Sequence, residues 1–329
     1  MPAATRIRDD LRYGFAVGRV RVLQGRLLTP GAFERLLDAP DLREQKRILA
    51  ETHLGRYLES ATTATEVERG LAASLADLYD EFLEKAELPP ALVTYFLLPH
   101  DFIDLRAVLK ARRYGVPIEG PVSGLGVLDP ETMSEPAQLP EPFGTIARRI
   151  EGAEEPLTSD EITAEIDREL FAELAKAAKA SKVPFLRELT TLRIDIANVR
   201  LLLRARQRGL AAADIAGRLI PGGTPSLERI AQVAPRMSGD ELATAIVNTG
   251  ALGYVIEEDL LDLERFDLVA DTLVAGRMLA ARRAPSGAEP VLAYVMAREA
   301  EVLLVRTVVL GHLSGLDREL VRARVKERG

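Results

Sequence analysis

The sequence contains no cysteine among its 329 residues, which excludes disulfide scaffolds, thiolate zinc sites and cysteine nucleophiles. It has no tryptophan, and aromatic residues make up only 5% of the chain. Uninterrupted apolar runs of transmembrane length are also missing, since the nearest candidate, 291–313, contains two arginines and two glutamates. No membrane-spanning helix is therefore expected. The first residues lack the apolar core of a secretory signal, so a cytoplasmic location is expected.

Positive charge is in deficit, because 43 basic residues face 50 acidic ones and give a net charge of −7. This balance argues against nucleic acid as a partner and against non-specific binding to anionic lipid. His53, His100 and His312 are far apart and show no metal-ligand spacing. The chain also lacks a GxxxxGK[ST] phosphate loop and a GxSxG elbow. The sequence thus offers no catalytic, metal-binding or cofactor-binding residues, and no cofactor is expected.

What the chain has in abundance is alanine, leucine, arginine and glutamate, which favour helix over strand. The fold class predicted is all-α, with helices paired through Gly/Pro turns. Thr158 and Glu161 form a capping-box pair at a helix start, and Pro99 is expected to kink or break the helix around it. Apolar spacing and cap signals predict helices at 6–24, 65–87, 91–114, 159 onward, 185–208, 226–234, 238–248, 257–282, 290–313 and 315–327.

Residues 116–144 differ from this helical background. Six prolines and four glycines fall there together with acidic residues, and lysine and arginine are absent. We expect a long acidic loop enclosing a short helix near Glu131. Loops of this length are uncommon inside compact domains and often mark a functional segment or a domain junction.

The strongest pattern is a fifteen-residue helical repeat. Residues 101–115 read DFIDLRAVLKARRYG and residues 195–209 read DIANVRLLLRARQRG. Six positions are identical, where about one would be expected by chance. A weaker third copy at 301–315 reads EVLLVRTVVLGHLSG. It keeps the first acid, the arginine at the sixth position and the final glycine. Repetition of one helical unit indicates an architecture built from copies rather than around one unique pocket.

Basic residues line one face of the repeat helices. Arg106, Lys110 and Arg113 are spaced i, i+4, i+7, and a second stripe contains Arg193, Arg200, Arg204 and Arg208. Such a stripe can bind carboxylates of a partner protein. It can equally be a solvated face, or pair with acidic residues of neighbouring helices. Arg306 is the corresponding residue of the third copy.

The acids of the repeat admit two roles as well. Asp101, Asp195 and Glu301 occupy its first position, with Glu299 close by. A buried carboxylate here can pair with an arginine of an adjacent copy and specify how copies pack. General acid–base catalysis is the other role open to carboxylates, but the sequence places no nucleophile or metal beside them. These acids and the basic residues above are therefore candidates for partner binding or for packing between repeats.

These segments carry a resemblance to a known family. The stretch Tyr13–Arg21 (YGFAVGRVR), followed by Leu27–Leu28, resembles the start of the C subunit of bacterial and archaeal V/A-type ATPases, the counterpart of the d subunit of eukaryotic V-ATPases. The motifs DxxDLRxxLKARxxG and DxxNVRxxLRARxxG, and the stretch from Ala293 to Arg306, are similar to that family's repeated helices. Together they extend from about residue 11 to about residue 320.

The resemblance implies three similar helical domains around a pseudo-threefold axis, forming a funnel. We place the boundaries approximately at 1–115, 116–209 and 210–329. It also implies a non-catalytic socket in the central rotor stalk, binding the D and F shaft subunits at one end and the membrane proteolipid ring at the other. The third copy departs from the pattern, with Leu304 at the fourth position and His312 in place of the second arginine. The alternatives are a generic helical-repeat adaptor and a soluble enzyme with an all-α site.

Overall fold

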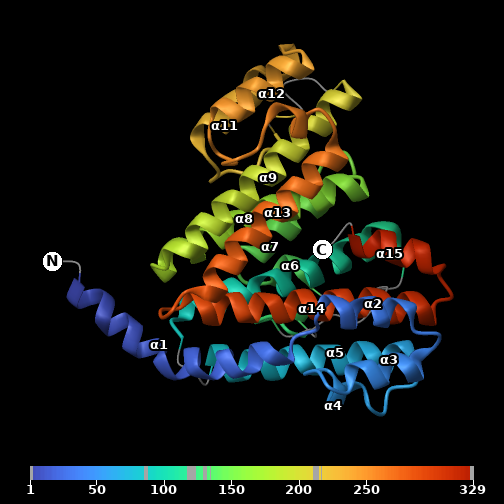
Figure 1. The fold of residues 1–329 in the computed structure, drawn as a ribbon. Coiled ribbons are helices and arrows are strands. Elements are labelled where there is room, and N and C mark those ends of the chain that lie inside the picture. The colour runs from blue at the N-terminus through green and yellow to red at the C-terminus, as the bar shows by residue number, and fades with distance from the viewer. Residues whose placement is uncertain are drawn as a thin grey trace. The chain divides into compact units, whose positions relative to one another are not determined.

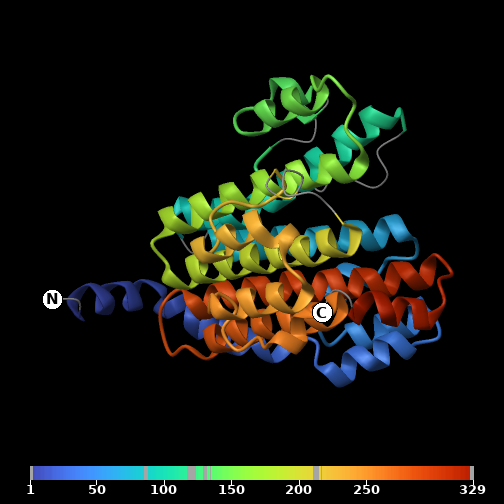
Figure 2. The ribbon, with the colours of Figure 1, turned by 90° about the horizontal axis from the view of Figure 1, so that it is seen from above.

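The computed structural model describes residues 3–84, 88–116, 124–128, 132–133, 135–209, 215 and 217–326. Within these ranges it contains fourteen α-helices and no β-strand, which confirms the all-α prediction. Contacts group the chain into two compact units (Figures 1 and 2). The first unit combines Met1–Leu88 with Arg277–Gly329, and the second is Pro89–Gly276. The predicted division into three domains stays a prediction.

The first unit brings together segments from both ends of the sequence. Its amino-terminal elements are α1 (Ala3–Leu23), α2 (Pro30–Asp38), α3 (Leu42–Leu49), α4 (Gly55–Leu58) and α5 (Ala64–Tyr79). Helix α5 starts at a capping box formed by Thr63 and Glu66, and continues into a π-helical turn, Asp80–Glu84. Helices α14 (Glu289–Leu313) and α15 (Arg318–Lys326) complete the unit, and α14 packs along α5 and α1 (Figure 1).

The second unit contains α6 (Pro90–Tyr114), α7 (Phe143–Glu151), α8 (Ser159–Ser181), α9 (Pro184–Arg208), α11 (Pro225–Val233) and α12 (Gly239–Asn248). Helix α13 (Leu263–Arg283) begins in this unit and ends in the first. Helix α8 packs against both α6 and α9. The interior between α9, α11, α12 and α13 is apolar, with Leu202, Leu242 and Phe266 all nearly inaccessible to solvent.

The long helices follow the sequence signals closely, because those signals are local. Thr158 and Glu161 form the predicted capping box of α8. Helices α6 and α9 end at Gly115 and Gly209, whose φ values of 61° and 64° are left-handed, and a residue without a Cβ suits that conformation.

Two helix predictions need comment. Pro99 does not break α6, which runs continuously from Pro90 to Tyr114, and the alternative that Pro99 kinks the helix stays a prediction. A proline inside a helix costs about 3 kcal/mol, and buried side chains on both sides of Pro99, such as Leu98 and Phe102, offset that loss. The helix predicted from residue 257 starts at Leu263, because the Asp262 carboxylate caps it by accepting the Glu264 N–H at 3.0 Å.

The segment at 116–144 is only partly described, and Glu131, where a short helix was expected, lies outside the described residues. The described part contains a 3₁₀ turn at Pro136–Gln138 and the start of α7. Met133 and Leu139 are buried. The segment therefore anchors apolar side chains in the second unit despite its acidic, proline-rich composition.

Candidate functional site

Three helices of equal length carry the three repeat copies. Helices α6, α9 and α14 each have 25 residues and carry a proline in the first turn. That proline stands eleven residues before the acid of the repeat in every copy. The final glycine of the third copy, Gly315, has a φ of 69°, matching Gly115 and Gly209. Proline at the start and a left-handed glycine at the end define the same helix three times.

The first-position acids of the first two copies hold the backbone of a following loop. Asp101 accepts the N–H groups of Val127 and Leu128 at 3.1 and 3.0 Å. Asp195 accepts the N–H and the hydroxyl of Thr224, both at 2.7 Å. Both aspartates are 1% exposed. Burial raises the pKa of each carboxyl, and the hydrogen bonds to its charged form oppose that shift.

Each of these aspartates is approached closely by a glycine. A Cβ on Gly126 would lie 1.9 Å from Asp101 Oδ1, and one on Gly223 would lie 2.5 Å from Asp195 Oδ1. No side chain fits at such distances, so the two loops can reach their carboxylates only because glycine stands there.

In the third copy a longer side chain, that of Glu301, holds the backbone of a loop. Glu301 Oε1 accepts the Leu28 N–H at 2.6 Å, immediately before α2. Its other oxygen pairs with buried Arg298, which also donates to Ser74 of α5 at 2.8 Å. Burial raises the pKa of Glu301, while Arg298 lowers it. All three acids therefore fix a loop that leads towards the short helices, which is a packing role.

The sixth-position arginines each form an ion pair with a neighbouring long helix. Arg106 Nη1 lies 2.9 Å from Asp167 of α8, and Arg200 Nε lies 2.5 Å from Asp267 of α13. Arg306 Nη2 lies 2.7 Å from Glu68 of α5. These pairs are partly exposed, and each stabilises the fold by about 1 kcal/mol or less. Their common geometry matters more than their energy, since one contact recurs in every copy.

The other basic candidates are placed differently. Lys110 lies near Asp167, where its charge lowers the pKa of that carboxyl, although burial is the larger effect and raises it. Arg113 is exposed, with Nε 3.4 Å from the Leu157 carbonyl oxygen. Arg204 is exposed and makes no ion pair with the residues that the structure describes. The basic stripes thus divide into internally paired arginines and outward-facing ones.

Sequence reasoning missed one further polar residue of the repeat. Asn198, at the fourth position and 2% exposed, donates to the Ile220 carbonyl and accepts the Ile220 N–H, both at 2.9 Å. It also missed the acidic partners of the arginines. Glu68 and Asp267 each stand five residues after the N-cap of their helix, but Asp167 stands nine residues after Thr158. No shared position in the sequence therefore marks these acids as partners.

The described residues include no group of three or more His, Asp or Glu side chains placed to hold a metal ion. None of the described helices is long and apolar enough to cross a bilayer. Two histidines are poor proton acceptors: burial lowers the pKa of His53 and of His100 to about 4. His53 Nε2 instead lies 3.0 Å from the Leu23 carbonyl oxygen and 3.2 Å from the Tyr294 hydroxyl.

Comparison with known proteins gives a consistent result. The ATP synthase (C/AC39) subunit family matches residues 16–324. The chain is 27% identical to the C subunit of the A-type ATP synthase of Thermococcus onnurineus, over 94% of this chain and 89% of the relative. It is 28% identical to the C subunit of the V-type ATP synthase of Thermus thermophilus, over 96% and 98% respectively. The chain therefore belongs to the C/AC39 family of V/A-type ATP synthase subunits.

Proposed function

We propose that this chain is the socket of the central rotor stalk, receiving the D and F shaft subunits at one end and resting on the membrane proteolipid ring at the other. The C/AC39 protein is a non-catalytic component of the central stalk in V/A-type rotary ATP synthases, and the chain is a member of that family. The observation that carries the proposal is the family match over nearly the whole chain. In this role the chain transmits torque and lies peripheral to the membrane on its cytoplasmic side.

The repeated ion pairs support an arrangement of three similar lobes. Arg106 of α6 pairs with α8, the helix before α9, and Arg200 of α9 pairs with α13, the helix before α14. Arg306 of α14 pairs with α5, the helix before α6. In each case the arginine of a repeat helix therefore pairs with a helix that precedes a repeat helix in the chain. An open solenoid, in which each copy contacts only its chain neighbours, would leave its last copy without this contact, so the adaptor alternative is disfavoured.

The outward-facing basic residues are the proposed partner contacts. Arg204 and Arg113 are exposed and present positive charge near the ends of α9 and α6, whereas Lys110 is half-buried beside Asp167. Arginine forks bind carboxylates of a neighbouring protein well. Arg106, Arg200 and Arg306 serve instead to hold long helices together, because their guanidinium groups are already paired.

Co-purification tests the proposal. A tagged copy of the chain, isolated from membranes at low salt, should bring other components of the rotary ATPase with it, and isolation without them would overturn the proposal.

A matched pair of variants then separates docking from packing. Arg204→Glu should weaken assembly while leaving the melting temperature unchanged. Arg200→Glu places a carboxylate beside Asp267 and Asp271 and should lower stability by roughly 1–2 kcal/mol. Equal assembly of the Arg204→Glu variant and the wild-type chain would remove Arg204 from the docking surface.

A further inference from the structure

The chain passes between its two units twice, once between Leu88 and Pro89 and once between Gly276 and Arg277. The first crossing is not helical, because Pro89 has a φ of −52° and a ψ of 138°. The second crossing lies inside α13, which runs without interruption from Leu263 to Arg283. Of these two crossings only the second is made by a regular element, so the stiffness of the link depends on α13.

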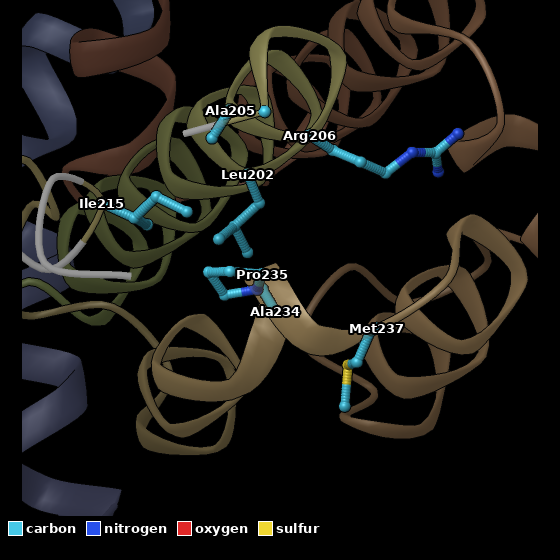
Figure 3. A pocket seen from close by; sticks show the side chains of 8 residues that line it. Leu202, Ala205, Arg206, Ile215, Ala234, Pro235 and Met237 are labelled. Carbon is cyan, nitrogen blue, oxygen red and sulfur yellow. The ribbon is translucent and has the colours of Figure 1, made fainter. Parts of the chain in front are cut away.

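The amino-terminal half of α13 is anchored in the second unit. Phe266 and Ala270 are almost inaccessible to solvent and belong to the apolar interior of that unit. Leu202 of α9 lies in the same interior and points towards Pro235 (Figure 3). Burial of apolar side chains thus fixes this half of the helix to the second unit.

The carboxyl end of α13 is anchored in the first unit. Arg21 of α1 donates to the carbonyl oxygens of Arg282 and Ala284. The last carbonyl groups of a helix have no partner within the helix, and a guanidinium group can bind them. Ala281 is buried as well. The two ends of this one helix therefore belong to different units.

Between these anchors, one turn of α13 has little support from the rest of the chain. Ala275, Gly276 and Arg277 are all exposed, and so are Leu279 and Ala280. Successive residues of an α-helix differ in direction by about 100°, so three consecutive exposed positions face most of the way round the helix. Tertiary packing supplies most of the stability of helices in proteins, and it is largely missing where α13 passes from one unit to the other.

Neither packing nor backbone conformation requires glycine at position 276. A Cβ on Gly276 would meet no heavy atom within 4 Å, and its backbone is not left-handed. Gly311 of α14 is different, since a Cβ on it would lie 2.7 Å from a methyl carbon of Val321. In a helix interior, glycine is destabilising relative to alanine because its backbone loses more conformational freedom. Gly276 therefore weakens the helix in its exposed turn.

We propose that α13 bends at Gly276, so that this exposed turn is a hinge between the two units of the chain. Hinges consist of a few residues that absorb changes in φ and ψ, and these residues are often small. Bending at this turn disturbs few side-chain contacts and leaves the anchors at both ends of the helix intact. The hinge is a property of the chain alone, so this inference goes beyond the proposed function and does not depend on it.

Pulsed electron paramagnetic resonance on the isolated full-length chain tests the hinge. The chain has no cysteine of its own, so nitroxide labels can be attached at Glu59→Cys in the first unit and Gln207→Cys in the second, both exposed positions. The distribution of distances between the labels should become narrower with Gly276→Ala and broader with Ala275→Gly. Hydrogen exchange of the Ala280 amide should slow about fivefold with Gly276→Ala, because alanine stabilises the helical turn.

Two controls separate a hinge from a general stiffening of the protein. Gly18→Ala lies in open space on α1, within the first unit, and should leave the distribution between the units unchanged. Labels at Lys179 and Gln207, both in the second unit, should give the same distribution in every variant. Equal widths in the wild type, Gly276→Ala and Ala275→Gly would overturn the proposal, and so would equal narrowing by Gly18→Ala. A change in the distribution within the second unit would place the motion there and would overturn the proposal too.

Discussion

Replacing Asn198 by alanine should be among the more destabilising single changes in the second unit. The Asn198 amide makes two hydrogen bonds of 2.9 Å with the backbone of Ile220. Asn198 is 2% exposed and Ile220 is 8% exposed, so water cannot readily replace the lost partners. Ile220 also begins the loop that leads to Thr224, which Asp195 holds.

The expected loss follows from counting the groups left without partners. Asn198→Ala orphans one N–H and one C=O of Ile220, and each buried, unsatisfied group costs about 1–3 kcal/mol. The free energy of unfolding should therefore fall by roughly 2–5 kcal/mol. The free energy of unfolding of Asn198→Asp should lie between those of the wild type and Asn198→Ala. Its carboxylate still accepts the Ile220 N–H but places an oxygen against the Ile220 carbonyl.

Urea denaturation gives the free energy, and hydrogen exchange at the Ile220 amide reports on the loop itself. Gln207→Ala is the control, since Gln207 is exposed on the same helix and its change should stay within about 0.5 kcal/mol. If Asn198→Ala also stays within that range, with unchanged protection of the Ile220 amide, the loop does not depend on this clamp.

Two further predictions concern partly buried residues of the second unit. Gly126→Ala should lower stability by about 2–3 kcal/mol, because its Cβ would displace the Asp101 carboxylate. The control is Gly18→Ala, in open space on α1, which should be neutral or slightly stabilising. Equal melting temperatures of the two variants would contradict the prediction for Gly126. His100 has a pKa of about 4 through burial, so the stability it contributes is complete above pH 6.5 and is lost as the pH falls towards 4. His100→Gln should reduce that acid-dependent loss by up to about 3 kcal/mol. Urea denaturation of the wild type and the variant at several pH values tests this, and identical pH dependence of their stabilities would refute a role for His100.

The sequence predicted the long helices well because their signals are local. Leu71, Leu75 and Leu78 form an apolar stripe along α5, and all three are buried. The glycine at the end of α6 and of α9 needs no tertiary information either. Helices α2, α3 and α7, of eight or nine residues, were not predicted.

The candidate site was predicted only in part. The repeat singled out Asp101, Asp195 and Glu301, but their hydrogen-bond partners are backbone groups 26 or more residues away in the chain. The arginine stripes left docking and internal pairing open, since spacing on one helix says nothing about the facing helix. Arg106 and Arg200 have carboxylates opposite them, whereas Arg204 has none among the described residues, and only tertiary structure distinguishes the two cases.

The hydrogen bond between Glu301 and Leu28 has a consequence for synthesis of the chain. Helices α2 to α5 leave the ribosome first, but α14, which supplies Glu301, Arg298 and Arg306 to them, is made some two hundred residues later. The second unit, by contrast, is one continuous stretch from Pro89 to Gly276. During translation the whole second unit is therefore synthesised before α14. The amino-terminal helices can form their contacts with α14 only after that helix has been made.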